Sequence, residues 1–489
     1  MNFSMIRRTL GTLLVFEAIF FLVPAVTAVC YQEWQPLLAF LGCMAISGGV
    51  GGLCVLKKPK NGNIYAKEGF VIVALSWLVM SIFGALPFLF TGATGSFVDA
   101  LFETVSGFST TGASIFTGEQ IDGMAKSLLM WRSFTHWVGG MGVLVFVMVF
   151  LPLSGAQNMH MMKAESPGPS VSKLVPKVRQ TALILYAIYS VLTVAEFFIL
   201  LAGGMGIFEA LNAAFATAGT GGFSVTSDGM AYGPYVQIVV TVFMLLFSVN
   251  FTSYYLLLCG KPKEAWTAEV RTFLIIVLSA IVLIACNVHF MGNFEGKGSF
   301  GDTLRQTAFY VASIVSTTGF GIETDFSLWP QFSIGILVLL MFVGACAGST
   351  GGGMKVSRWM ILAKGGTHEV GRLIHPKQVK KITMDGRVVE HEVVRSVNAY
   401  LVAFILIFFT SMLLISFDPL TQGDFTTAFT SVAATLNNIG PGVGPVVGPM
   451  GNFAGFTDFS KIVYIFDMLA GRLEVFPMLV LFAPSTWRK

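Results

Sequence analysis

The chain has 489 residues, of which 54% are hydrophobic and 11% are charged, and its formal net charge is +4. Soluble globular domains carry about 25% charged residues, so this composition excludes an ordinary soluble enzyme. The six cysteines stand singly and form no CxxC pair, so the sequence predicts neither a zinc site nor a disulfide framework. Because no basic run alternates with aromatic residues, nucleic acid is not expected as a partner.

Ten apolar runs reach the length of about 20 residues that crosses a lipid bilayer. They are 9–29, 36–56, 70–93, 128–152, 181–203, 235–259, 271–291, 331–366, 396–417 and 460–483. The first run follows Arg7-Arg8 like a signal peptide, but the apolar core of a signal peptide has only about 7–15 residues. We therefore expect residues 1–67 to form a retained two-helix hairpin in contact with membrane lipid.

The other eight runs pair around four shorter segments that lead into Gly-containing stretches. These segments are 97–111, 206–218, 303–317 and 424–437. Because they are too short to cross, we expect each to enter the membrane and return, which is possible where the backbone lines a cavity or is buried in protein.

The predicted fold class is an all-α polytopic membrane protein. It has the N-terminal hairpin and four repeats of helix, re-entrant pore loop and helix in a pseudo-fourfold arrangement, with about 10 transmembrane helices and 4 pore helices. The predicted divisions are the hairpin 1–67, repeat 1 at 68–160, repeat 2 at 161–264, repeat 3 at 265–390 with a broken second helix, and repeat 4 at 391–489.

The distribution of positive charge supports this topology. With ten crossings, both termini and four internal loops fall on one side, and that side collects 24 of the 30 Lys and Arg residues. Positively charged loops remain in the cytoplasm. We therefore predict a multi-pass protein of the cytoplasmic membrane with both termini in the cytoplasm.

The Gly stretches at the centre of the repeats favour an ion-conducting pore. They are Ser109-Thr110-Thr111-Gly112, Ala216-Thr217-Ala218-Gly219, Ser316-Thr317-Thr318-Gly319 and Asn437-Asn438-Ile439-Gly440. Glycine adopts backbone angles that are closed to other residues, so a loop that contains it can turn its carbonyls toward a common axis. A ring of such carbonyls replaces the water around a dehydrated potassium ion. A half-helix ahead of each loop would point its partially negative C-terminal end toward the cation.

These loops, each between two spans, resemble those of the TrkH/KtrB/HKT superfamily of potassium uptake proteins. The hairpin 1–67 is similar to that of the bacterial TrkH branch, and the resemblance covers essentially the whole chain. In plant relatives a serine at the first filter glycine accompanies sodium transport, so Gly112 favours potassium. The resemblance implies a potassium-binding filter of Thr110, Thr111, Gly112, Thr217, Ala218, Gly219, Thr317, Thr318, Gly319, Asn438, Ile439 and Gly440.

The eighth run is interrupted by three consecutive glycines. Each costs a helix about 1 kcal/mol relative to alanine, so the helix should open there. Resemblance to TrkH-like proteins implies that the opened segment is an intramembrane gating loop that obstructs the pore. Gly344, Ser349, Thr350 and Lys355 match that loop. The residues expected to take part in gating are Gly348, Ser349, Thr350, Gly351, Gly352, Gly353 and Lys355. A phosphate-binding loop is the rival interpretation, but Met354 separates Gly353 from Lys355 and no soluble strand precedes the segment.

Arg472 lies near the middle of the last run. An arginine inside the membrane is a functional-site hypothesis by default, and the resemblance implies that it faces the conduit beneath the filter and takes part in gating. The alternative is a buried ion pair with Asp467 or Glu474 that fixes helix packing.

The leading hypothesis is potassium influx through a gated pore of a bacterial inner membrane, driven by the membrane potential. Proton- or sodium-coupled symport by the same fold is the alternative. A membrane enzyme is not expected, because no cluster of acids and no nucleophile with a base lies at a membrane face. The chain needs no cofactor, and potassium is its substrate. The resemblance further implies a homodimer and a cytosolic nucleotide-binding ring, TrkA. The long basic segment 358–395 is either the dock for this ring or a solvated loop that follows the positive-inside rule.

Overall fold

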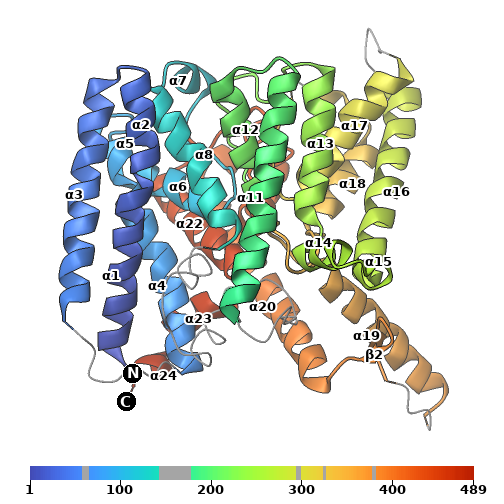
Figure 1. The fold of residues 1–489 in the computed structure, drawn as a ribbon. Coiled ribbons are helices and arrows are strands. Elements are labelled where there is room, and N and C mark those ends of the chain that lie inside the picture. Colours follow the sequence, from blue (N-terminus) through green and yellow to red (C-terminus); the bar gives the residue numbers. More distant parts are fainter. Residues whose placement is uncertain (58–64, 143–177, 293–298, 323–325, 377–380, 489) are drawn as a thin grey trace.

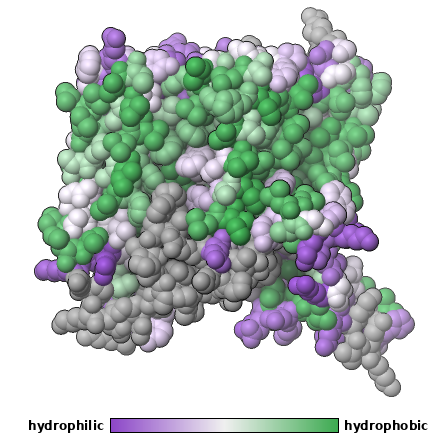
Figure 2. Space-filling view, in the orientation of Figure 1, coloured by the Kyte–Doolittle hydropathy of each residue, from purple (hydrophilic) through white to green (hydrophobic). Residues whose placement is uncertain are grey.

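The computed structural model describes residues 1–57, 65–142, 178–292, 299–322, 326–376 and 381–488. Within these residues the regular structure is helical except for strands β1 (Thr383–Met384) and β2 (Arg387–Val388), which pair antiparallel. Both termini lie on the same side of the molecule (Figure 1). On the face shown in Figure 2, hydrophobic residues form a broad band between more hydrophilic ends. These features confirm the all-α polytopic membrane class.

The N-terminal hairpin is present as predicted. Helices α1 (Phe3–Phe20) and α2 (Leu22–Cys30) rise along α3 (Trp34–Leu56). The crossing of α1 and α3 is close, because a Cβ on Gly51 would lie 2.7 Å from the carbonyl oxygen of Gly11. Small residues allow membrane helices to approach in this way. The hairpin packs on α4 and α8 of the next unit and lies at one edge of the bundle (Figure 1).

Each of the four following units begins with a long apolar helix. These helices are α4 (Ala66–Gly84) with its continuation α5 (Leu86–Phe90), α11 (Val178–Ala202), α16 (Ala268–Met291) and α20 (His391–Ile415). Together with the hairpin they account for the six helices, among the described residues, that are long and apolar enough to cross a membrane.

A short helix follows each long one. The four short helices are α6 (Phe97–Phe108), α12 (Ile207–Gly219), α17 (Phe300–Val315) and α21 (Phe425–Leu436). Side chains define where they begin: the Ser299 hydroxyl accepts from the Asp302 N–H (3.3 Å), and the Asp424 carboxylate accepts from the Thr427 N–H (3.1 Å). Their 12 to 16 residues are fewer than the roughly 20 that cross a bilayer, as the sequence predicts.

The second helices of the units are interrupted more widely than predicted. They are α8 (Lys126–Gly140), α13 (Pro234–Ser248) with α14 (Phe251–Leu258), α18 (Gln331–Met341) with α19 (Val356–Ile374), and α22 (Asp458–Arg472) with α23 (Phe476–Phe482). The sequence analysis predicts one interruption, within 331–366. The runs 235–259 and 460–483 are broken as well, and α13 and α14 meet at 90°. The run 128–152 continues beyond the described residues.

Hydrogen bonds explain the break between α13 and α14. The Asn250 side chain caps α14 by accepting from the Thr252 N–H (2.8 Å). The backbone groups freed at the break bond to the loop 342–355 between α18 and α19: Cys346 N–H donates to Ser248 O (3.0 Å) and Phe251 N–H donates to Gly348 O (3.1 Å). Interrupted backbone at membrane depth must find such internal partners. The break between α13 and α14 and the break between α18 and α19 therefore supply hydrogen-bond partners to each other.

The break between α22 and α23 has a different cause. Glu474 and Val475 both adopt positive φ angles, 55° and 67°, which end the helical hydrogen-bond ladder. The remaining short elements are α7 (Gly118–Asp122), α15 (Pro262–Ala265), α24 (Pro484–Trp487) and the 3-10 turns η1 (Phe326–Leu328) and η2 (Pro419–Thr421).

Candidate ion pathway

The loops that follow the four short helices share one backbone conformation. In each, a non-glycine residue with φ between 55° and 60° is followed two positions later by a glycine with φ between 74° and 96°. Non-glycine residues rarely adopt this left-handed region, so its recurrence identifies the four loops as copies of one structure. We call them the ring loops; their paired residues are Thr110 and Gly112, Thr220 and Gly222, Thr317 and Gly319, and Asn438 and Gly440.

The same backbone hydrogen bond joins each ring loop to its helix. The residue between the two left-handed positions donates to a carbonyl five residues earlier. The four bonds are Thr111 N–H to Ser106 O (2.9 Å), Gly221 N–H to Ala216 O (2.9 Å), Thr318 N–H to Ser313 O (3.0 Å) and Ile439 N–H to Ala434 O (2.8 Å). Such bonds satisfy carbonyls left open at a helix C-terminus, so each loop starts from a fixed helix end.

The structure corrects the predicted position of the second loop. Thr217, Ala218 and Gly219 lie in the last turn of α12, whereas the residues equivalent to the other three loops are Thr220, Gly221 and Gly222. The other three predicted stretches occupy ring loops in the predicted register, including Asn438–Gly440. The second prediction was three residues early because the stretches around Gly219 and Gly222 have similar compositions.

Each ring-loop glycine stands against the middle residue of the next loop. A Cβ on Gly112 would collide with the carbonyl oxygen of Gly221, and the same relation joins Gly222 to Thr318, Gly319 to Ile439 and Gly440 to Thr111. This order returns to the first loop, so the four loops form a closed ring. Only glycine fits at these four positions, because the neighbouring carbonyl occupies the space of a side chain.

A small cavity of about 90 Å³ borders all four ring glycines. Ser114, Ser224 and Asn452 are among the polar residues that line it. The ring therefore adjoins a small chamber that is lined in part by polar residues.

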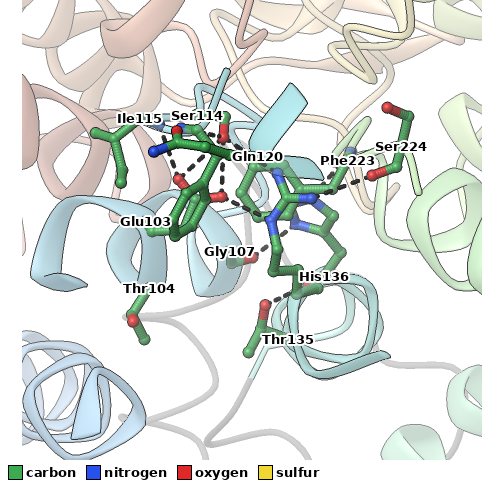
Figure 3. Close-up of polar contacts among 12 residues, drawn as sticks. Glu103, Thr104, Gly107, Ser114, Ile115, Gln120, Thr135, His136, Phe223 and Ser224 are labelled. Atoms are coloured by element: carbon green, nitrogen blue, oxygen red, sulfur yellow. Dashed lines mark hydrogen bonds and ion pairs between the residues drawn. The ribbon is translucent and has the colours of Figure 1, made fainter. Parts of the chain in front are cut away.

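A buried ion pair braces this side of the ring (Figure 3). Arg132 on α8 is 2% exposed and its Nε donates to Glu103 Oε1 on α6 (2.7 Å). Its other nitrogens donate to Ser224 O (3.1 Å) and Ser114 Oγ (3.1 Å), and Glu103 also accepts from the Ile115 N–H (3.0 Å). The pair thus connects the loop segments that follow the first two glycines.

His136 forms a second brace one helical turn from Arg132. Its Nδ1 lies 2.8 Å from the Gly107 carbonyl oxygen, and its Nε2 accepts from the Phe223 N–H (3.3 Å) (Figure 3). A carbonyl can only accept, so Nδ1 carries the hydrogen and the ring is neutral. His136 therefore joins the end of α6 to the second ring loop.

The first residues of the ring loops contact the loop 342–355. The Thr317 hydroxyl accepts from the Gly352 N–H (2.6 Å), and the Thr220 hydroxyl donates to the Thr350 carbonyl (3.1 Å). A Cβ on Gly352 would lie 2.7 Å from the Asn437 carbonyl oxygen. The glycine-rich segment predicted from Gly348 to Gly353 thus lies directly against the ring.

Two cationic side chains lie in the same region. Lys355 is 1% exposed and its ammonium donates to the carbonyls of Gly351 and Gly352. Arg472 donates to the Thr350 carbonyl (2.8 Å) and to the Gly140 carbonyl (2.9 Å). The structure therefore brings Lys355 and Arg472 to the segment 350–352 of the glycine-rich stretch.

The two acids proposed as alternative partners of Arg472 also contact other residues. Glu474 forms an ion pair with Arg358 on α19, and Asp467 accepts from the Ser411 hydroxyl (2.6 Å). Arg472, which lies at the end of α22, thus extends toward backbone carbonyls of the loop 342–355 and of α8.

Glu269 is a site residue that the sequence analysis does not identify. It lies in the first turn of α16, where an acidic residue is ordinary because it complements the helix dipole. In the structure it is 8% exposed and accepts from the backbone N–H groups of Ala347, within the loop 342–355, and of Ser357, in the first turn of α19. Nothing in its sequence position distinguishes it from a solvated helix-terminal acid.

Comparisons with known proteins agree with this geometry. The family model TrkH, described as a cation transport protein, matches residues 39–489. The Trk system potassium uptake proteins TrkH of Salmonella typhimurium and Escherichia coli K12 are 36% and 35% identical to the chain, each over all of both proteins. The crystal structure of the potassium transporter TrkH from Vibrio parahaemolyticus has a TM-score of 0.87 at 33% identity, covering all of both chains. The chain therefore belongs to the TrkH family of cation transport proteins, which are transporters and not enzymes.

Proposed function

We propose that the chain carries potassium ions into a bacterial cell across its cytoplasmic membrane, with the ring loops as the selectivity filter. The observation that carries the proposal is the closed ring. In it, each ring-loop glycine lies against a carbonyl oxygen of the next loop, and these oxygens belong to Thr111, Gly221, Thr318 and Ile439. Carbonyl rings of this kind replace the hydration shell of potassium without a fixed charge that would trap the ion. The relatives named as potassium uptake proteins support this cargo.

The helix ends around the ring favour a cation there. Four short helices end at the ring loops, so four partially negative C-termini lie beside the carbonyls. In this proposal the filter consists of Thr110–Gly112, Thr220–Gly222, Thr317–Gly319 and Asn438–Gly440. The originally predicted Thr217, Ala218 and Gly219 belong to the helix that supports it.

We infer that the loop 342–355 is the gate. It is bonded to the ring through Thr220 and Thr317, and the ammonium of Lys355 and the guanidinium of Arg472 lie beside it. The partially positive N-terminus of α19 follows the loop directly. These positive groups oppose the passage of a cation, so the loop must move for potassium to pass.

The proposed membrane orientation, repeat boundaries and partners follow from the family resemblance and the charge distribution. Both termini are assigned to the cytoplasm, and the chain is divided at the boundaries 67/68, 160/161, 264/265 and 390/391, of which 160/161 lies outside the described residues. A homodimer is proposed, and the segment 358–395 is proposed to dock a cytosolic nucleotide-binding ring.

Cation flux into liposomes that contain the purified chain tests the proposal. At a fixed potassium diffusion potential, we expect rapid rubidium uptake with little sodium uptake, and reduced discrimination in Gly112→Ser. Equal rubidium and sodium flux through the unaltered chain would refute a potassium filter. Rubidium uptake that follows an imposed proton or sodium gradient at zero potential would replace the proposal with the coupled symporter.

A further inference from the structure

Glu269 holds the loop 342–355 at two points, one within the loop and one just after it. Its Oε1 accepts from the Ala347 N–H (2.8 Å), on the segment that leaves α18, and from the Ser357 N–H (3.0 Å), in the first turn of α19. The side chain is buried at 8% exposure. One carboxylate oxygen therefore ties the two limbs of the loop to α16, a long membrane helix.

The bond to Ser357 replaces the missing cap of α19. The first N–H groups of a helix have no partner within it, and the N-cap residue Lys355 provides no side-chain cap. A carboxylate supplies a charge-assisted acceptor and complements the positive end of the helix dipole. Glu269 thus fixes where α19 begins relative to α16.

The strand hairpin β1–β2 contacts Ala268, the residue of α16 that precedes Glu269. Asp385, in its turn, accepts from the Ala268 N–H (2.7 Å), and Lys364 on α19 donates to the Thr383 carbonyl (2.7 Å). The hairpin is exposed, with Asp385 at φ 47°. Ala268 and Glu269 are consecutive. A movement of the hairpin that changes the position of Ala268 would therefore also change the position of Glu269.

We propose that Glu269 is a positioning residue that latches the loop 342–355 against the ring, and that the hairpin 383–388 controls this latch through Asp385. The inference rests on the proposed gate. Glu269 does not contact the ring; it acts through Ala347 and Ser357. When the latch is released, the loop loses one of the anchors that hold Thr350 and Gly352 against the ring loops, and it moves away from the ion path more readily.

Basal rubidium flux of the full chain in liposomes is the first test. Glu269→Ala should raise it about tenfold, as expected when charge-assisted bonds that favour the closed state are lost. Glu269→Gln, which keeps a carbonyl acceptor without the charge, should raise it less. The control Glu392→Ala, at an exposed acid in the first turn of α20, should leave the flux unchanged.

The accessibility of Cys346 provides a readout that is independent of flux. Cys346 is fully buried next to Ala347. In chains that keep Cys346 as their sole cysteine, Glu269→Ala should accelerate its labelling by a soluble maleimide, and Asp385→Ala should do so to a smaller extent. The double variant should resemble Glu269→Ala alone, because both changes act on one route.

A chain that lacks residues 351–353 separates failure of the latch from failure of the gate. If this deletion raises the flux while Glu269→Ala and Glu269→Gln leave both flux and labelling unchanged, the latch is wrong and the gate stands. If the deletion also leaves the flux unchanged, the proposed gate itself is wrong. Size-exclusion profiles identify any variant that does not fold. If Glu269→Ala does not fold, the flux and labelling of the milder variant Glu269→Gln test the latch instead.

Discussion

The hydroxyl of Thr317, in the third ring loop, accepts a 2.6 Å hydrogen bond from the backbone N–H of Gly352 in the loop 342–355. The proposed filter and the proposed gate are therefore in direct contact. A movement of the loop 342–355 can therefore reach the ring without an intervening element.

Thr317→Val removes this acceptor and retains the shape of the side chain. We expect basal rubidium flux to rise about fivefold, since a neutral hydrogen bond contributes about 1 kcal/mol. Thr317→Ser keeps the hydroxyl and should remain near the wild-type flux. If both variants match the wild type, the bond does not hold the loop closed.

Gly319→Ala should abolish selective transport, because its Cβ would collide with the Ile439 carbonyl oxygen. Gly92→Ala is the matched control: Gly92 also has a positive φ, 71°, but open space surrounds its Cβ position. It should lower stability by about 1–3 kcal/mol through backbone strain and keep its rubidium-to-sodium ratio. An unchanged ratio in folded Gly319→Ala would contradict the ring assignment.

The corrected second loop gives a prediction of its own. Gly222→Ser should reduce discrimination between rubidium and sodium, because Gly222 faces the Thr318 carbonyl. Ala218→Gly, in the last turn of α12, should cost about 1 kcal/mol of helix stability without changing that ratio. A changed ratio in Ala218→Gly together with an unchanged ratio in Gly222→Ser would instead assign the filter to residues 217–219.

Arg132→Met should lower the free energy of unfolding by about 3–5 kcal/mol, because it leaves the Glu103 carboxylate buried without its cation. Adding Glu103→Leu should recover part of this loss, since an apolar pair does not require ionic partners. Thermal unfolding in detergent measures both variants. Equal transition temperatures for the single variant and the wild type would show that the pair does not stabilise the fold.

Hydrophobic patterning was sufficient to predict the hairpin, the long first helices and the four short helices, because each is set by segment length and apolar content. The opening of the eighth run followed from its three consecutive glycines. These features are local, so the sequence carries them directly.

The remaining features depend on contacts between distant segments. The break after Ser248 is stabilised by Cys346 and Gly348, nearly 100 residues further along the chain, and no glycine or proline marks it. The second ring loop was misplaced because its register is set by the left-handed φ of Thr220. Glu269 was missed because its partners are backbone groups of a loop and of a helix that lie far from it in the sequence.

Anomalous diffraction from crystals in rubidium or thallium salts tests the central claim most directly. The account predicts a peak on the axis of the ring, at similar distances from the carbonyl oxygens of Thr111, Gly221, Thr318 and Ile439, and its loss when sodium replaces the heavier ion. Ordered peaks elsewhere in the bundle, with an empty ring at saturating rubidium, would contradict it.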